Sequence, residues 1–245
     1  MKQAVTAVLY SPGTNCHEET AAAIELAGGK SEFVLLRDLL DGQARLDRYQ
    51  AAVIPGGFSY GDHLGAGRIF ATLLVAQLLE QLVEFLAARK PLLGVCNGFQ
   101  VLTEAGILPL RTPGERELAL VANLSARFED RQVCLLVTGE KCMWTEGLAG
   151  QILEFPSAHG EGRPLAQTSH DLSSFHVVFR YCDADGNPTQ HYPENPNGAP
   201  EGVAGITDKT GLVLGLMPHP ERASLATHSS QDGFRLFQNL VRFLK

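Results

Sequence analysis

The 245-residue sequence has no cluster of basic side chains. Its 20 Lys and Arg residues are outnumbered by 27 Asp and Glu residues, which gives a formal net charge of −7. A protein whose main partner is a phosphate backbone needs clustered Lys and Arg, so we expect no nucleic-acid partner. Charged residues make up 19% of the chain and hydrophobic residues 44%. That composition is typical of a soluble globular protein and too apolar for a disordered one.

The sequence also lacks a long, uninterrupted apolar run. The most apolar stretch, Ile69 to Leu79, has about half of the ~20 residues that a membrane-spanning helix needs. The first residues, Met1 to Val5, lead into a strand-like run without the apolar core of a signal peptide. We therefore expect a cytoplasmic protein with no membrane partner.

Cysteines are few, odd in number and irregularly spaced, and none forms a Cys-x-x-Cys pair. They are Cys16, Cys96, Cys134, Cys142 and Cys182. This pattern argues against a disulfide framework and against a structural zinc site, and we expect no metal in the chain. A buried core position is the favoured interpretation for Cys134, Cys142 and Cys182.

Strand-like and helix-like segments alternate in the first part of the chain. Apolar runs bounded by Gly or Pro predict strands, and apolar residues at helical spacing predict helices. The expected strands span residues 5–10, 33–36, 51–54 and 91–95, and the expected helices span residues 16–27, 68–89 and 97–105. This alternation is typical of an α/β fold with a doubly wound, mainly parallel sheet and helices on both faces.

From Leu118 onward, strand-like runs follow one another without intervening helices. They span residues 119–121, 133–138, 176–182, 203–207 and 212–217, and a final helix is expected over 231–244. Residues 183–202 are rich in Pro, Gly and Asn and are expected to form a loop. The pattern predicts an antiparallel β extension and a single domain over residues 1–245.

The segment Gly94-Val95-Cys96-Asn97-Gly98 stands where a predicted buried strand meets a predicted helix. This is the arrangement of a nucleophile elbow, with cysteine in place of serine. Flanking glycines suit a tight turn in which Cβ atoms would collide with neighbouring backbone. The turn would project the sulfur from the carboxyl edge of the sheet, beside a helix N-terminus that favours the thiolate. Cys96 is therefore the candidate nucleophile.

A histidine and a glutamate follow the last predicted strand, in Met217-Pro218-His219-Pro220-Glu221. Pro220 disfavours helical geometry at His219, so we expect an extended segment in which positions i and i+2 face the same side. Glu221 can then hold one imidazole nitrogen while the other faces Cys96, as in a Cys-His-Glu triad. Taken alone, the segment would favour a surface histidine in a proline-rich turn.

Paired glycines close the third predicted strand, in Pro55-Gly56-Gly57-Phe58. Together with the N–H of Asn97, their backbone N–H groups could stabilise an oxyanion, a contribution of about 3 kcal/mol per donor. The alternative is a simple glycine-rich turn. A phosphate-binding loop is not indicated, because neither a Gly-x-Gly-x-x-Gly nor a Walker sequence is present.

Six short motifs are spread over nearly the whole chain. They are Pro12-Gly13-Thr14-Asn15-Cys16, Gly56-Gly57-Phe58-Ser59-Tyr60-Gly61-Asp62, Gly94-Val95-Cys96-Asn97-Gly98-Phe99-Gln100, His159-Gly160-Glu161-Gly162, Asn195-Pro196-Asn197-Gly198 and Met217-Pro218-His219-Pro220-Glu221-Arg222-Ala223. In this order they resemble the class I, triad-type glutamine amidotransferases, which have a flavodoxin-like fold. In the residues that they contain, they resemble the glutaminase subunits of phosphoribosylformylglycinamidine synthases.

The resemblance implies a reaction and a role for each member of the triad. Cys96 would attack the side-chain amide of L-glutamine to give a glutamyl thioester and ammonia. His219 would protonate the leaving amine and later activate water, and Glu221 would orient His219. The resemblance also implies roles for seven further residues: an oxyanion hole from the backbone N–H groups of Gly57 and Asn97, substrate binding by Gln100 and Phe58, and substrate or subunit contacts by His159, Glu161 and Asn195.

The resemblance further implies a partner that uses the ammonia. This partner is a separate ATP-using synthetase subunit, which converts formylglycinamide ribonucleotide to formylglycinamidine ribonucleotide in de novo purine biosynthesis. ATP and Mg are expected on that partner, and no cofactor is expected in this chain. A small third protein that bridges such complexes is a further candidate partner.

Two other kinds of function stay open. The chain could serve another synthetase or act as a stand-alone cysteine hydrolase of the same fold, although the Asn195 loop and Phe99 argue against both. It could also be a catalytically idle scaffold subunit, although the intact set of Cys96, His219 and Glu221 argues against that.

Overall fold

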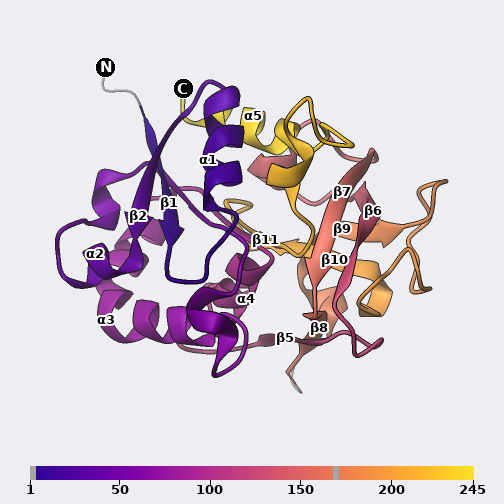
Figure 1. Ribbon diagram of the computed structural model, residues 1–245, viewed down its shortest axis with the longest axis horizontal. Helices are drawn as coiled ribbons and strands as arrows, with labels where there is room; N and C mark the ends of the chain where they lie inside the picture. Colours follow the sequence, from indigo (N-terminus) through magenta and orange to yellow (C-terminus); the bar gives the residue numbers. More distant parts are fainter. Residues whose placement is uncertain (1–3, 168–170) are drawn as a thin grey trace.

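The computed structural model describes residues 4–167 and 171–245, which form a mixed β-sheet flanked by helices (Figure 1). The strands are β1 (Val5–Tyr10), β2 (Lys30–Leu35), β3 (Ala51–Ile54), β4 (Leu92–Val95), β5 (Leu118–Ala122), β6 (Glu129–Val137), β7 (Ile152–His159), β8 (Glu161–Ala166), β9 (His176–Cys182), β10 (Val203–Thr207) and β11 (Val213–Leu216). The α-helices are α1 (His17–Leu26), α2 (Leu36–Leu40), α3 (Arg68–Ala87), α4 (Asn97–Glu104) and α5 (Phe234–Phe243).

Within the described residues, nine strands form one sheet in the order β2-β1-β3-β4-β11-β10-β9-β6-β7. The pairs from β2 to β11 are parallel. The pairs from β11 to β7 are antiparallel. Strands β5 and β8 form a separate antiparallel pair. The predicted parallel sheet with an antiparallel extension is confirmed.

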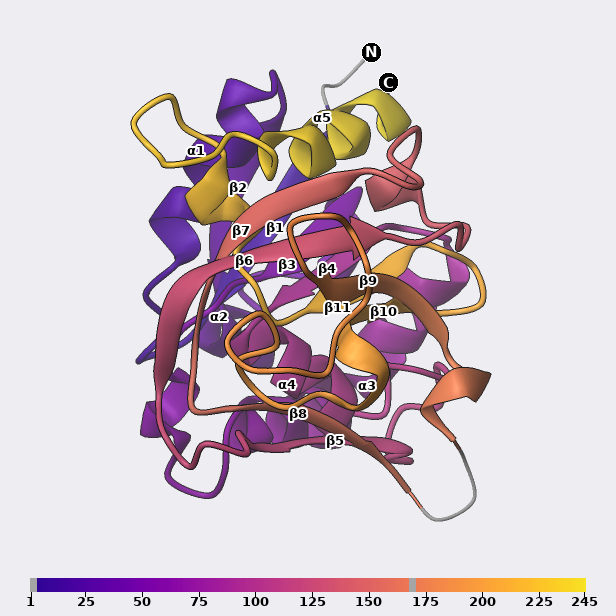
Figure 2. The same cartoon turned by 90° about the vertical axis from the view of Figure 1, so that its right-hand side faces the viewer.

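The helices lie on both faces of the parallel half of the sheet. Helices α1 and α5 contact each other on one face, and α3 and α4 contact each other on the opposite face (Figures 1 and 2). Strands β3, β4 and β11 are buried at every residue, because helices cover them on both sides. This double cover explains why these strands are continuous apolar runs and why the sequence predicts them well.

Two strands are missing from the sequence prediction, β7 and β8. Each contains a proline, Pro156 in β7 and Pro164 in β8, and a proline within a run argues against a central strand. Strand β7 tolerates Pro156 because it lies at the edge of the large sheet. Its buried and less buried residues alternate regularly, but two of the buried residues are the polar Ser157 and His159, so the sequence shows no apolar alternation there.

Some predicted boundaries were also wrong. The second strand starts at Lys30 and ends at Leu35, and Leu36 opens the short helix α2 instead of closing the strand. The last helix starts at Phe234, three residues after the predicted Gln231. The prediction for residues 183–202 is confirmed: this segment contains no strand or α-helix among the described residues and ends in a 3₁₀ turn at Pro200–Gly202.

Helix α3 extends beyond the apolar stretch Ile69 to Leu79 at both ends. It is the one helix in the described part of the chain that is long and apolar enough to cross a membrane by length and composition. Its polar residues Gln77, Glu80, Gln81 and Glu84 recur at helical spacing and so share one side. The buried residues lie on another side, which is the pattern of a helix packed on the core of a globular domain.

Candidate active site

Cys96 stands between the end of β4 and the first residue of α4, with φ 50° and ψ −106°. An L-amino acid rarely adopts a positive φ, and this strained turn is the geometry of a nucleophile elbow. The neighbouring glycines are required by space: a Cβ on Gly98 would lie 1.9 Å from the carbonyl oxygen of Ile54, and one on Gly94 would lie 2.6 Å from that of Gly98. The predicted elbow is confirmed.

His219 and Glu221 follow β11 and are almost completely buried, with exposed fractions of 2% and 0%. His219 Nδ1 lies 2.6 Å from Glu221 Oε1. The predicted contact is therefore confirmed, but its local geometry differs from the prediction. Only His219 is extended, with φ −102° and ψ 93°, and Glu221 belongs to a 3₁₀ turn over Pro220–Ala223.

The backbone N–H of His219 donates to the carbonyl oxygen of Pro156 in β7 (2.8 Å). This bond ties the end of the parallel half of the sheet to its antiparallel edge. Pro156, the residue that argued against a strand at β7, therefore supplies the backbone acceptor that positions His219.

Opposing effects act on the protonation of His219. Burial works to lower the pKa of the imidazole, but the carboxylate of Glu221, followed by the thiolate of Cys96, raises it well above its ordinary value. His219 Nε2 is buried and has no hydrogen-bond partner among the described residues. The imidazole is thus charge-stabilised on the Nδ1 side and free to exchange a proton on the Nε2 side.

Cys96 and His219 line one cavity of about 340 Å³. The Cys96 thiol donates to the carbonyl oxygen of Ala158, the residue before the end of β7 (3.6 Å). Cys142 and Cys182 are buried, Cys134 is half-buried, and none of the three lines this cavity. Cys96 is therefore set apart from these other cysteines by both its backbone and its surroundings.

Five of the other predicted site residues also line the cavity: Gly57, Phe58, Gln100, His159 and Glu161. Asn97 does not line the cavity, but it follows Cys96 directly as the first residue of α4, where a helix leaves N–H groups without an acceptor inside the helix. The structure thus brings the predicted oxyanion-hole residues Gly57 and Asn97 to the same place as Cys96. The side chain of Phe58 is half exposed at this cavity and lies against Phe128.

The Gln100 amide is already engaged within the protein. It donates to the carbonyl oxygen of Glu161 (2.6 Å) and accepts from the side chain of Asn97 (2.9 Å). The Asn97 amide oxygen in turn accepts from the backbone N–H of Ser59 (3.1 Å). This network holds the start of α4 against the first residue of β8 and against the turn that begins at Ser59.

His159 and Asn195 are both fixed by internal hydrogen bonds. His159 Nε2 lies 2.9 Å from Ser157 Oγ, and its Nδ1 lies 3.1 Å from Asn123 Oδ1. Burial, and then the charge of His219, lowers the pKa of His159 to about 3, so this ring stays neutral. Asn195 is buried outside the cavity, and its side chain donates to the carbonyl oxygens of Thr189 and Ala199. These contacts give Asn195 a role in shaping its loop.

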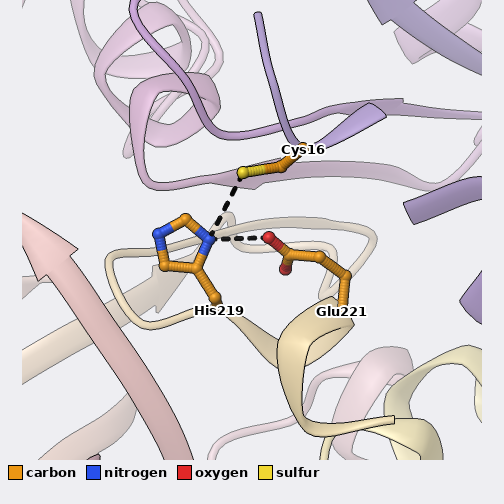
Figure 3. Close-up of side chains that lie close together, drawn as sticks. All are labelled: Cys16, His219 and Glu221. Atoms are coloured by element: carbon orange, nitrogen blue, oxygen red, sulfur yellow. Dashed lines mark hydrogen bonds and ion pairs between the residues drawn. The ribbon is translucent and has the colours of Figure 1, made fainter. Parts of the chain in front are cut away.

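The position of Cys16 beside His219 was not predicted from the sequence. This residue is 1% exposed, and its sulfur lies 3.9 Å from His219 Nδ1, on the side of the ring that also faces Glu221 (Figure 3). Burial, as the largest effect, raises the pKa of the Cys16 thiol. Cys16 and His219 are 203 residues apart in the chain, so no local pattern connects them. The only signal was that Cys16 belongs to one of the six motifs.

Comparisons with known proteins agree with this geometry. Residues 3–244 match the CobB/CobQ-like glutamine amidotransferase domain. The chain belongs to this family. Over 222 residues it is 44% identical to the phosphoribosylformylglycinamidine synthase subunit PurQ of Methanococcus maripaludis, with 88% of this chain and 81% of the relative covered. Over 256 residues it is 38% identical to the protein of the same name from Dehalococcoides mccartyi, with 100% of this chain and 99% of the relative covered.

A solved structure is similar over the full length of this glutamine amidotransferase domain. A chain in the structure of PurLQS from Thermotoga maritima superimposes with a TM-score of 0.81 at 32% identity, and the match covers 99% of this chain and 100% of that chain. The fold class expected from the sequence is therefore confirmed, including its class I glutamine amidotransferase character.

Proposed function

We propose that this chain is the glutaminase subunit of a phosphoribosylformylglycinamidine synthase. It hydrolyses L-glutamine to glutamate and ammonia, and the ammonia is used in de novo purine biosynthesis. Relatives of that name that match nearly the full chain support the proposal. The observation that carries it is the strained Cys96 in one cavity with the buried His219–Glu221 pair.

In the proposed mechanism, the Cys96 thiolate attacks the side-chain carbonyl carbon of glutamine. The oxygen of the tetrahedral intermediate becomes negative and accepts hydrogen bonds from the N–H groups of Gly57 and Asn97. His219 then gives a proton to the leaving nitrogen, and ammonia departs from a glutamyl thioester. Water attacks the thioester while His219 accepts its proton, and glutamate leaves with the thiolate restored.

Glu221 supports both proton transfers. Its carboxylate holds Nδ1 of His219 at 2.6 Å, which orients the ring and stabilises the imidazolium. The raised pKa of His219 makes its imidazole a suitable acceptor for the proton that Cys96 loses when it attacks. Gln100 and Phe58 are proposed to contact the substrate from the cavity wall, and His159 and Glu161 to contact the substrate or a partner subunit. Asn195 lies outside the cavity and is proposed to contact a partner subunit.

The proposal includes a synthetase subunit that receives the ammonia. The similarity to a chain of the PurLQS structure supports such a complex, and a small bridging subunit fits the same proposal. That synthetase is proposed to hold ATP and Mg and to convert formylglycinamide ribonucleotide to formylglycinamidine ribonucleotide. We propose a cytoplasmic location for the complex, as the sequence analysis predicts.

The test separates release of ammonia from its use. Wild-type chain and Cys96→Ala are each assembled with the synthetase, and product formation is measured with glutamine and, separately, with an ammonium salt. We expect Cys96→Ala to lower the glutamine-dependent rate by at least about 10³-fold and to change the ammonium-dependent rate by less than about twofold.

Cys134→Ala is the matched control, because Cys134 is half-buried in β6 and does not line the cavity. It should leave both rates close to those of the wild type. An equal fall of both rates in Cys96→Ala would contradict the role given to Cys96. Glutamine turnover with no gain from a synthetase would favour a stand-alone hydrolase instead.

A further inference from the structure

Three side chains with metal-binding atoms meet at the back of the catalytic histidine: Cys16, His219 and Glu221. Their ligand atoms all lie within 4.8 Å of one another. Figure 3 shows the Cys16 sulfur and a Glu221 oxygen approaching the same nitrogen of His219. The sulfur lies 3.9 Å and the carboxylate oxygen 2.6 Å from this atom, Nδ1. The three residues are only 1%, 2% and 0% exposed, so water competes little for their ligand atoms.

The donor set is one sulfur, one imidazole nitrogen and one carboxylate oxygen, which is chemistry that suits Zn²⁺. Tetrahedral zinc holds these atoms at about 2.0–2.3 Å, and neighbouring ligand atoms then stand about 3.3–3.6 Å apart. The observed separations of 3.9 and 2.6 Å lie on either side of that spacing. A zinc ion would therefore draw the sulfur slightly inward and displace the carboxylate from its hydrogen bond.

Two further observations point to a ligand at this cluster. Glu221 Oε2 is buried without a hydrogen-bond partner among the described residues, so this carboxylate has an unused oxygen. Cys16 and His219 both line the 340 Å³ cavity, which offers an entry path and room for water as a fourth ligand. The nearby cation Arg222 is paired with Glu19 at 3.3 Å, which offsets its repulsion of a second cation.

We propose that Cys16, His219 and Glu221 form an inhibitory site for Zn²⁺. The Cys16 thiol would lose its proton to solvent and become a thiolate ligand. The proton shared by His219 and Glu221 would also leave, because Zn²⁺ takes its place at Nδ1. The bound ion would deprive Cys96 of a proton acceptor, so glutamine hydrolysis would stop. Inhibition rests on the proposed glutaminase function, whereas metal binding does not.

Binding is measured first, on the full chain alone and without any activity assay. Co²⁺ is used as the spectroscopic probe, because a thiolate ligand gives a near-ultraviolet charge-transfer band and a tetrahedral site gives strong visible bands. We expect these bands in the wild type and in Cys96→Ser, and their displacement by Zn²⁺. We expect no thiolate band in Cys16→Ser, while the control Cys134→Ser should keep it.

Inhibition is measured next in the complex with the synthetase, with each variant compared with its own zinc-free rate. Loss of a ligand should cost at least as much affinity as loss of a supporting contact, so Cys16→Ser should raise the half-inhibitory Zn²⁺ concentration at least about tenfold. Ammonium-dependent synthesis should resist Zn²⁺ at concentrations that stop glutamine-dependent synthesis.

Several outcomes would contradict the proposed zinc site. One is a wild-type chain that shows no thiolate band with Co²⁺. Another is a band that disappears in Cys96→Ser and persists in Cys16→Ser, which would assign the metal to the catalytic thiol. If Cys16→Ser does not fold, Glu221→Gln in the Cys96→Ser background replaces it, and an unchanged Co²⁺ affinity there would also reject the proposal.

Discussion

At the scale of single residues, the direction of the Cys96 sulfur is set by the backbone. A positive φ in a residue other than glycine costs about 1–3 kcal/mol and persists only where the surroundings hold it. The N–H of Cys96 donates to the carbonyl oxygen of Leu216 in β11 (2.8 Å), and its carbonyl accepts from the N–H of Gln100 in α4 (3.1 Å). These two bonds join the strained residue to a strand and a helix, so the sulfur is aimed before any substrate arrives.

His159 is the second residue at the cavity whose charge state the fold controls. Its imidazole is 2% exposed and hydrogen-bonded at both nitrogens, and its pKa is lowered to about 3. A charged ring here would add a second cation beside His219, so a permanently neutral His159 leaves His219 as the group that exchanges protons in the cavity.

The lowered pKa of His159 predicts a pH dependence of stability. Between pH 6.5 and about 3 the unfolded chain binds a proton at this residue and the folded chain does not, so stability falls as the pH falls. Relative to His159→Gln, the wild type should lose up to about 1.4 kcal/mol of unfolding free energy per pH unit in this window. Urea unfolding of both proteins at several pH values measures the slopes, and parallel slopes would show that His159 is not held neutral.

At the scale of elements, the approach of α4 to β3 decides where the elbow can form. Gly98 in the first turn of α4 lies so close to the carbonyl of Ile54 that no side chain fits between the helix and the strand. The close approach of Gly98 to Ile54 places the start of α4, and with it the Asn97 N–H, at the carboxyl end of β4. Gly98 is therefore needed for space, although glycine is a poor helix former.

Replacing Gly98 by alanine tests this packing. In an open helix the change would stabilise the fold by about 1 kcal/mol, but here the added Cβ would meet the Ile54 oxygen at 1.9 Å. We expect Gly98→Ala to destabilise the protein by about 1–3 kcal/mol and to lower glutaminase activity, because α4 must shift away from β3.

Gly139→Ala is the matched control, because a Cβ at Gly139 would meet no atom within 4 Å. Its unfolding free energy should stay within about 0.5 kcal/mol of the wild type. Thermal or urea unfolding of the three proteins gives the comparison. A stabilised Gly98→Ala would mean that the helix and strand have room to spare.

At the scale of the whole molecule, the site lies where the two halves of the sheet meet. Cys96 follows β4 in the parallel half, while Ala158 and Pro156 belong to β7 at the antiparallel edge. Both contact the site through carbonyl oxygens, one accepting from the Cys96 thiol and one from the His219 N–H. The cavity therefore requires both halves of the sheet to be folded together.

This continuity predicts a single cooperative unfolding transition. Trp144 is the only tryptophan in the sequence, is fully buried, and donates from Nε1 to the carbonyl of Leu212, just before β11 (3.0 Å). The side chain of Asn239 in α5 donates to the carbonyl of Trp144 (3.1 Å). Tryptophan fluorescence and far-ultraviolet circular dichroism should thus give the same denaturant midpoint. Two separate midpoints would contradict a single domain over residues 1–245.

Local sequence patterns made many of the strands and helices predictable, and also the Cys96 turn and the contact between His219 and Glu221. Strands such as β3 and β4 are buried on both faces and appear in the sequence as short apolar runs. The nucleophile elbow is predicted from five consecutive residues, 94–98. His219 and Glu221 are two residues apart, so their contact needed only a local geometry. Strand β7 escaped prediction because Pro156 is acceptable only at a sheet edge, and the order of strands in a sheet is not a local property.

The sequence by itself determined most strands and helices of the parallel half, the candidate nucleophile and the pairing of histidine with glutamate. Only the tertiary structure decided which surroundings these groups share: the neutral His159, the edge strand that positions His219, and Cys16 beside an imidazole 203 residues away. The physical reason is range. Turn geometry and hydrophobic period act between neighbours in the chain, whereas burial, charge and metal-binding geometry depend on groups that only folding brings together.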